Sequence, residues 1–241
     1  MKKNKIRDLI YVSRTNDQQC FYSYGIEFFE FINSIPNRPE NLILLNHHFD
    51  YARRNQHTNF EYVTRLEIEL LLDDDVYGYG NFCWVDFAKE EDLNRLSNGQ
   101  IAELLFFSHM AKPMKSIPMN RFAYYAHDDG WFNKLYVTDL RDYESLLSNV
   151  IINKLGLLTG RLFPKLPSDI SSILLECTRE GLFIDLSKII KTRGKLKIPI
   201  ASVGHYTDMD KVYDFKEHID EYKVIIEYSN VNKSWKVIRE D

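Results

Sequence analysis

The feature of this chain that most constrains its fold is the intermixing of two short apolar patterns. Residues Phe82–Phe87 and 222–228 are rich in aromatic and β-branched side chains, which is typical of strands. Residues 26–35 and 60–72 instead carry apolar side chains at helical spacing. The regular strand–helix–strand spacing that indicates a parallel sheet is missing from the sequence. The pattern therefore predicts an α+β fold with mixed sheets, flanking helices and a C-terminal β-hairpin.

Residues 156–167 contain two glycines and two prolines and lie between patterned stretches on either side. The 241 residues suffice for one large domain or two small ones, since a domain typically holds roughly 100–200 residues. We therefore expect an α+β N-terminal region, residues 1–155, and a smaller α+β C-terminal region, residues 168–241. One continuous domain is the alternative.

The apolar runs are all far shorter than the roughly 20 residues of a membrane-spanning helix, the best being 104–107 and Phe122–Ala126. The basic N-terminus lacks the apolar stretch of a secretory signal. Cys20, Cys83 and Cys177 show no paired spacing, which indicates reduced thiols rather than disulfides or a zinc ribbon. Together these features predict a soluble cytoplasmic protein without a membrane partner.

Two histidines and an aspartate follow a predicted buried strand at residues 42–45. His47, His48 and Asp50 offer the imidazole and carboxylate ligands that Zn, Mn or Fe accept. Adjacent side chains of an extended chain point in opposite directions, so both imidazoles could reach one ion only if the chain turns there. No fixed ligand spacing such as H-E-x-x-H is present. The alternative is a polar loop that leaves the sheet.

A second pair, His127 and Asp128, follows the predicted strand 121–126. The Asp-Gly dipeptide beside it suits a tight β-hairpin turn, and turn formation is the alternative explanation of the pair. If strands 42–45 and 121–126 run parallel in one sheet, their ends lie at the same edge. The predicted metal ligands are then the whole set of His47, His48, Asp50, His127 and Asp128.

Aromatic side chains cluster around the same two loops. If the strands that carry Trp84 and Trp131 are neighbours, they form an aromatic wall close to the His and Asp residues. The predicted ligand-binding residues are Trp84, Tyr125, Trp131 and Arg121. The alternative is ordinary packing of these rings in the core and across neighbouring strands.

A basic stretch comprises Lys188, Lys191, Arg193, Lys195 and Lys197. From Lys191 onward the charges alternate with other residues, which places like charges on one face of a strand. Such a face could hold phosphate or nucleic acid. The alternative is a solvated hairpin around the intervening glycine. The net charge of −4 argues against a dedicated nucleic-acid binder.

Three segments in the first two thirds of the chain resemble one known group. Residues 44–50 (LLNHHFD), 81–87 (NFCWVDF) and 121–136 are similar to uncharacterised soluble proteins of spore-forming Gram-positive bacteria. Some members carry the label oxalate:formate antiporter, which does not suit this chain because a secondary antiporter needs many spanning helices. The resemblance implies a bacterial origin and a cytosolic location. It implies no activity and no catalytic residues.

Two functions from different classes remain open at this point. The first is a non-enzymatic binding or regulatory protein that uses an aromatic-rich surface to hold a protein or a small-molecule ligand. The second is a metal-dependent hydrolase built on the His and Asp loops. The sequence contains no P-loop, dinucleotide-binding glycine turn, nucleophile elbow or EF-hand loop, so it identifies no cofactor and no nucleophile.

Overall fold

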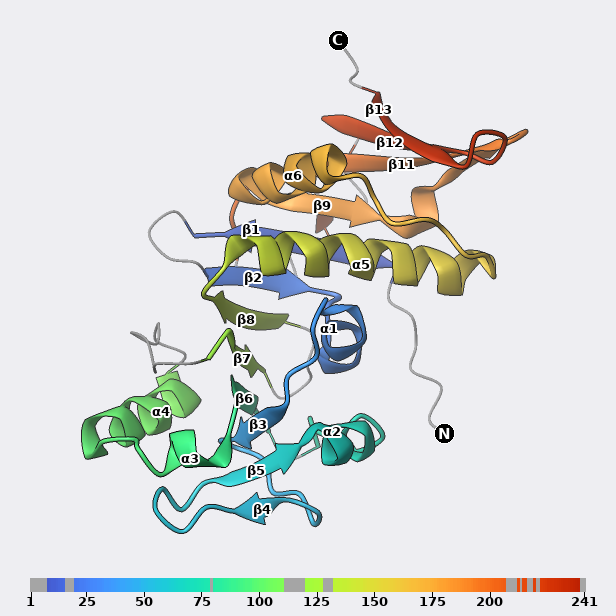
Figure 1. Ribbon diagram of the computed structural model, residues 1–241. Helices are drawn as coiled ribbons and strands as arrows, with labels where there is room; N and C mark the ends of the chain where they lie inside the picture. Colours follow the sequence, from blue (N-terminus) through green and yellow to red (C-terminus); the bar gives the residue numbers. More distant parts are fainter. Residues whose placement is uncertain are drawn as a thin grey trace.

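The computed structural model describes residues 8–15, 20–78, 80–110, 120–127, 132–206, 212, 214–215, 219 and 222–238. Within these residues, thirteen strands form one antiparallel sheet (Figure 1). The strands are β1 (Leu9–Arg14), β2 (Cys20–Tyr24), β3 (Asn41–Leu44), β4 (Arg53–Arg54), β5 (Glu61–Thr64), β6 (Phe82–Phe87), β7 (Phe122–Ala126), β8 (Phe132–Val137), β9 (Leu182–Asp185), β10 (Ile190–Thr192), β11 (Lys195–Ser202), β12 (Val224–Ser229) and β13 (Ser234–Ile238). Their order is β13-β12-β11-β9-β1-β2-β8-β7-β6-β3-β5-β4, with β10 paired to β11.

Helices cover both faces of this sheet. They are α1 (Phe28–Ser34), α2 (Arg65–Leu71), α3 (Glu90–Leu93), α4 (Asn98–Met110), α5 (Leu140–Thr159) and α6 (Ser168–Cys177), with the short 3-10 helices η1 (Thr178–Glu180) and η2 (Leu186–Lys188). The predicted α+β class, with flanking helices and a C-terminal hairpin of β12 and β13, is confirmed.

The sheet has one large core on one face and two smaller buried clusters on the other. One face, called the α5 face, is covered by α1, α2, α5 and α6, whose apolar side chains join the largest buried cluster. The other, called the α4 face, packs against Leu104 and Phe107 of α4 and Leu93 of α3. Strand side chains alternate between the two faces. For example, Tyr124 of β7 lies on the α5 face and Tyr125 on the α4 face.

The sheet continues without interruption across the two regions expected from the sequence. Strand β9 pairs with β1 on one side and with β11 on the other. The segment 156–167 links α5 and α6, which pack on the same face of the sheet. Helix α5 ends at Thr159, where Gly160 adopts the left-handed conformation that terminates the helix.

One predicted helix is wrong over its first half. The pattern of residues 60–72 indicates a single helix, whereas Glu61–Thr64 pairs with β3 as strand β5 and the helix begins at Arg65. Thr64 explains the change, because its backbone N–H donates to the Glu67 carboxylate at 2.8 Å in a capping box. A capping box of this kind marks the start of a helix at Thr64 and leaves the preceding residues free to join the sheet.

Two further features of the described residues concern their helices and their cysteines. Among the helices formed by the described residues, none combines the length and the apolar character needed to span a bilayer. Cys20, Cys83 and Cys177 are all free and buried. Burial raises the pKa of the Cys20 thiol to about 11, so it stays protonated at neutral pH.

Candidate anion-binding pocket

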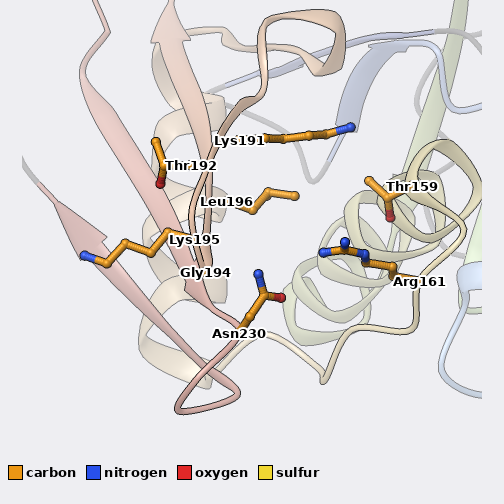
Figure 2. Close-up of a pocket in the computed structure, with 8 residues that line it drawn as sticks. All are labelled: Thr159, Arg161, Lys191, Thr192, Gly194, Lys195, Leu196 and Asn230. Carbon is orange, nitrogen blue, oxygen red and sulfur yellow. The ribbon is translucent and has the colours of Figure 1, made fainter.

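A sharp turn at the end of α5 positions the first side chain of the pocket. Gly160 adopts a left-handed conformation with φ 67°, and its N–H donates to the Gly156 carbonyl at 2.8 Å. Glycine adopts this conformation at little cost, which is why it so often ends helices. The chain therefore reverses after Thr159 and places Arg161 beside the end of the helix (Figure 2).

Two β-turns supply the opposite wall. The turn between β10 and β11 uses Gly194, whose φ is +81°. The turn between β12 and β13 begins at Asn230, and its backbone N–H donates to the Gly194 carbonyl at 2.8 Å. This hydrogen bond fixes the two turns against each other, so the Asn230 side chain lies over the gap next to the β10–β11 hairpin (Figure 2).

The helix end and the two turns enclose a pocket of about 210 Å³. The side chains of Arg161, Lys191, Leu196 and Asn230 lie around it, with Thr159 at the helix end (Figure 2). Leu196 is buried and belongs to the core of the α5 face, and its strand partner is Lys191. Directly paired residues share a face, which is why the Lys191 ammonium group lies on the pocket side of the sheet.

The neighbouring pair, Thr192 and Lys195, faces the other way. Figure 2 shows both side chains directed away from the gap. The Lys195 Nζ atom lies 3.1 Å from the Glu227 carboxylate, which Lys236 also contacts at 3.2 Å. Burial of Glu227 opposes its ionisation, but hydrogen bonds from the two lysines outweigh burial and lower the pKa of this carboxyl. Lys195 is thus directed at Glu227 on the face opposite α5 and not at the pocket.

The charge of the pocket is strongly one-sided. None of its eight lining residues is acidic, and within the described part of the chain Arg161 and Lys191 form no ion pair. Both side chains are exposed to water. The residues that line this space carry a guanidinium group, an ammonium group and a carboxamide group, whose N–H groups donate to carboxylate and phosphate oxygens. The geometry therefore suits an anion.

The histidines at the end of β3 are held by separate partners. His47 is buried, and its Nε2 atom lies 3.0 Å from the Asp74 carboxylate. His48 is exposed and lies 3.0 Å from Glu61 and 3.7 Å from Asp50. The chain bends after β3, so the two imidazoles point to different surroundings rather than to one ion.

Strands β3 and β7 do run parallel, as the combined metal site requires, because each is antiparallel to β6 between them. Their ends therefore lie at the same edge, two strand spacings or roughly 10 Å apart. However, the His47 ring packs against Phe82 on the α5 face, whereas His127 packs against Tyr125 on the α4 face. The sheet separates the two histidines.

The described residues contain no group of three or more His, Cys, Asp or Glu side chains arranged to hold a metal ion. Asp128, one of the predicted ligands, lies outside the described residues. The predicted metal set therefore stays a prediction, and the placement of His47 and His127 on opposite faces gives it no geometric support.

The predicted aromatic wall of Trp84 and Trp131 stays a prediction, because Trp131 lies outside the described residues. Trp84 is fully buried and stacks on Tyr124, with ring centroids 5.4 Å apart, in the core of the α5 face. Tyr125 pairs with Cys83 and packs against Phe107 on the α4 face. The pairing register places Trp84 and Tyr125 on opposite faces of the sheet. Both rings pack in buried clusters, as the alternative explanation of core packing describes.

Arg121 has a structural position as well. Its guanidinium group pairs with Asp142 at 3.0 Å, donates to the Asn37 carbonyl at 2.9 Å and lies over the Phe122 ring. It thereby ties the start of β7 to α5. The fourth predicted ligand-binding residue, Trp131, lies outside the described residues. The assignment of these four residues to a ligand stays a prediction.

The sequence indicated the basic hairpin that forms one wall of the pocket, but it did not indicate the residues of the other walls. Lys191 belongs to the basic stretch described above, but the expectation that its alternating charges share one face is wrong, because the turn at Gly194 places Lys195 on the opposite face. Arg161 and Asn230 were not among the predicted site residues. The signal for Arg161 was the Gly-Arg dipeptide directly after a helical pattern, because such a glycine turns the next side chain back beside the helix end. For Asn230 no local signal exists, since its position depends on the hydrogen bond to Gly194.

A serine–histidine contact on the α4 face was also missed. The Ser13 Oγ and His205 Nδ1 atoms lie 2.5 Å apart, and the Tyr11 hydroxyl donates to the Gly204 carbonyl while accepting from the Tyr206 N–H. Ser13 is buried and His205 is exposed. These contacts fasten residues 203–206 to β1.

Comparison of the chain with protein-family models, curated proteins and solved structures finds no match. The resemblance described in the sequence analysis therefore stays a prediction. The function has to be argued from the pocket itself.

Proposed function

We propose that this protein is a non-enzymatic binding protein that holds a small anion, or the anionic group of a larger ligand, in the pocket between α5 and the two turns. The proposal rests on the observation that Arg161, Lys191 and Asn230 line one pocket that has no acidic lining residue. The proposal keeps the binding role expected from the sequence and moves it from the aromatic residues to the basic hairpin. From the resemblance, we further propose a setting in the bacterial cytoplasm.

The size of the pocket limits the size of the ligand group that it can hold. Pockets for drug-sized molecules hold roughly 300–1,000 Å³, and this one holds about 210 Å³. A phosphate or carboxylate group fits that space, with the rest of a larger ligand outside it. Arginine favours such groups because its planar fork can donate two parallel hydrogen bonds to one oxyanion. The metal-dependent hydrolase has no comparable support among the described residues.

Titration with inorganic phosphate tests the proposal. We expect saturable binding by isothermal titration calorimetry, and Arg161→Ala should weaken it about 10-fold or more, since a hydrogen bond to a charged group contributes roughly 1.5–3 kcal/mol. Added sodium chloride should weaken binding further, because Arg161 and Lys191 are exposed and their charges are screened.

The matched control is Arg65→Ala. Arg65 is an exposed arginine on α2, paired with Glu40 and at the far end of the sheet from the pocket. This variant removes the same charge and should bind phosphate as the wild type does. Equal weakening in both variants would show a general charge effect, and absence of saturable binding in the wild type would overturn the proposal.

A further inference from the structure

Three neighbouring segments at the pocket each expose an aliphatic side chain. Leu162 follows Arg161 and is 99% exposed, Val231 follows Asn230 and is 82% exposed, and Ile190 precedes Lys191 and is 48% exposed. The segments adjoin one another. Asn230 is hydrogen-bonded to Gly194, and the Trp235 indole N–H donates to the Pro164 carbonyl at 3.0 Å. We call residues 160–166, 188–197 and 229–236 the basic end.

The basic end carries a charge opposite to that of the whole chain. Its three segments contain nine lysines and arginines and no aspartate or glutamate, although the chain has a net charge of −4. The acid nearest to them in the sheet, Glu227, is buried and held by Lys195 and Lys236. The three segments that expose the aliphatic side chains therefore carry positive charge only.

We propose that the basic end docks on an anionic phospholipid bilayer and that the pocket takes the phosphate of one lipid headgroup. Clusters of basic residues are attracted to anionic lipid surfaces, and each contributes a favourable share near the surface. Leu162 and Val231 enter the boundary between headgroups and acyl chains, where apolar side chains leave water. The headgroup part rests on the proposed function of the pocket.

The shape of the basic end favours a bilayer over the other polyanionic partners. Its aliphatic side chains project from separate segments instead of lining a groove, and a bilayer accepts several shallow insertions at once. Nucleic acid offers no apolar layer to Leu162 and Val231. The sequence-based expectation of no membrane partner rested on the lack of a membrane-spanning segment. Docking on the bilayer surface needs no such segment, so this proposal differs from that expectation.

Co-sedimentation with vesicles tests the docking. The full chain should bind mixed phosphatidylcholine–phosphatidylglycerol vesicles and should not bind phosphatidylcholine vesicles. Leu162→Gln should weaken vesicle binding about 10-fold, since it places a polar group in the apolar boundary, and should leave phosphate binding unchanged. Leu162 is almost fully exposed, so the change leaves the core intact. Leu66→Gln, at an exposed leucine of α2, is the matched control and should bind vesicles normally.

The outcomes separate this inference from the proposed function. Arg161→Ala should weaken both phosphate and vesicle binding. Phosphate binding without vesicle binding would overturn the docking and leave the pocket proposal standing. Equal binding to neutral vesicles, or an unaffected Leu162→Gln variant, would also overturn it. Binding of soluble poly-glutamate with no binding of anionic vesicles would indicate an acidic protein partner instead.

Discussion

Replacing Trp84 with alanine should lower the free energy of unfolding by about 3–5 kcal/mol, the range for large aromatic side chains removed from cores. Trp84 is fully buried, stacks on Tyr124 and contacts Phe28 and Phe31 edge to face. Its removal leaves a cavity at the centre of the α5 face. Urea unfolding followed by circular dichroism measures the loss.

Trp84→Phe is the matched variant. The Trp84 indole N–H is buried and has no hydrogen-bond partner among the described residues, so phenylalanine removes that polar group while it keeps an aromatic ring. We expect a smaller loss of stability than for alanine and phosphate binding equal to that of the wild type. A stable Trp84→Ala variant, or a Trp84→Phe variant that has lost phosphate binding, would contradict a core role.

The stability of the protein should fall by about 3 kcal/mol in all as the pH rises from about 3 to about 7, through Asp86 alone. Burial raises the pKa of this carboxyl from 3.8 to about 6, although the Phe122 and Arg121 N–H groups donate to it at 2.6 and 2.8 Å. Each pKa unit corresponds to about 1.4 kcal/mol. As the pH rises, the unfolded chain releases the proton first, so folding becomes less favourable until the pH passes the folded pKa.

Asp86→Asn keeps one acceptor oxygen for the two N–H groups and removes the titration. Unfolding free energies of the variant and the wild type, measured from pH 4 to pH 7, should therefore diverge in favour of the variant as the pH rises. Asp139→Asn serves as the control. Hydrogen bonds from Arg141 lower the pKa of exposed Asp139, so its loss should leave the fall above pH 4 in place. A parallel pH profile for Asp86→Asn would refute the burial argument.

Local patterns predicted the kinds of elements in this fold. The aromatic strand β6 and the terminal hairpin are confirmed, because alternation and turn residues act within a few positions. The β5 and α2 region was mistaken for one helix. Its apolar spacing fits both forms over so short a stretch, and the capping pair of Thr64 and Glu67 decides between them.

The pocket depends on contacts that no local pattern contains. The sequence showed the basic stretch but not its faces, because the turn at Gly194 places Lys191 on the pocket side and Lys195 on the opposite face. Arg161, on the other wall, lies thirty residues before Lys191 in the chain. Which face each strand residue occupies depends on register, and a shift of one residue exchanges the faces. This is why Trp84 and Tyr125 were expected on one surface, although their strands place them on opposite sides of the sheet.

The pairing of β1 with β9 has a consequence for folding during synthesis. Leu9 lies opposite Asp185, and Val12 lies opposite Leu182. Strand β1 is therefore synthesised long before β9, the strand with which it pairs. At about 5–20 residues per second, the ribosome needs roughly ten to thirty seconds to deliver β9. Until then one edge of β1 has no partner strand, and such edges invite pairing with other chains. Nascent chains of this protein should therefore depend on a chaperone, or on slow translation at low concentration, more than a fold of local contacts would.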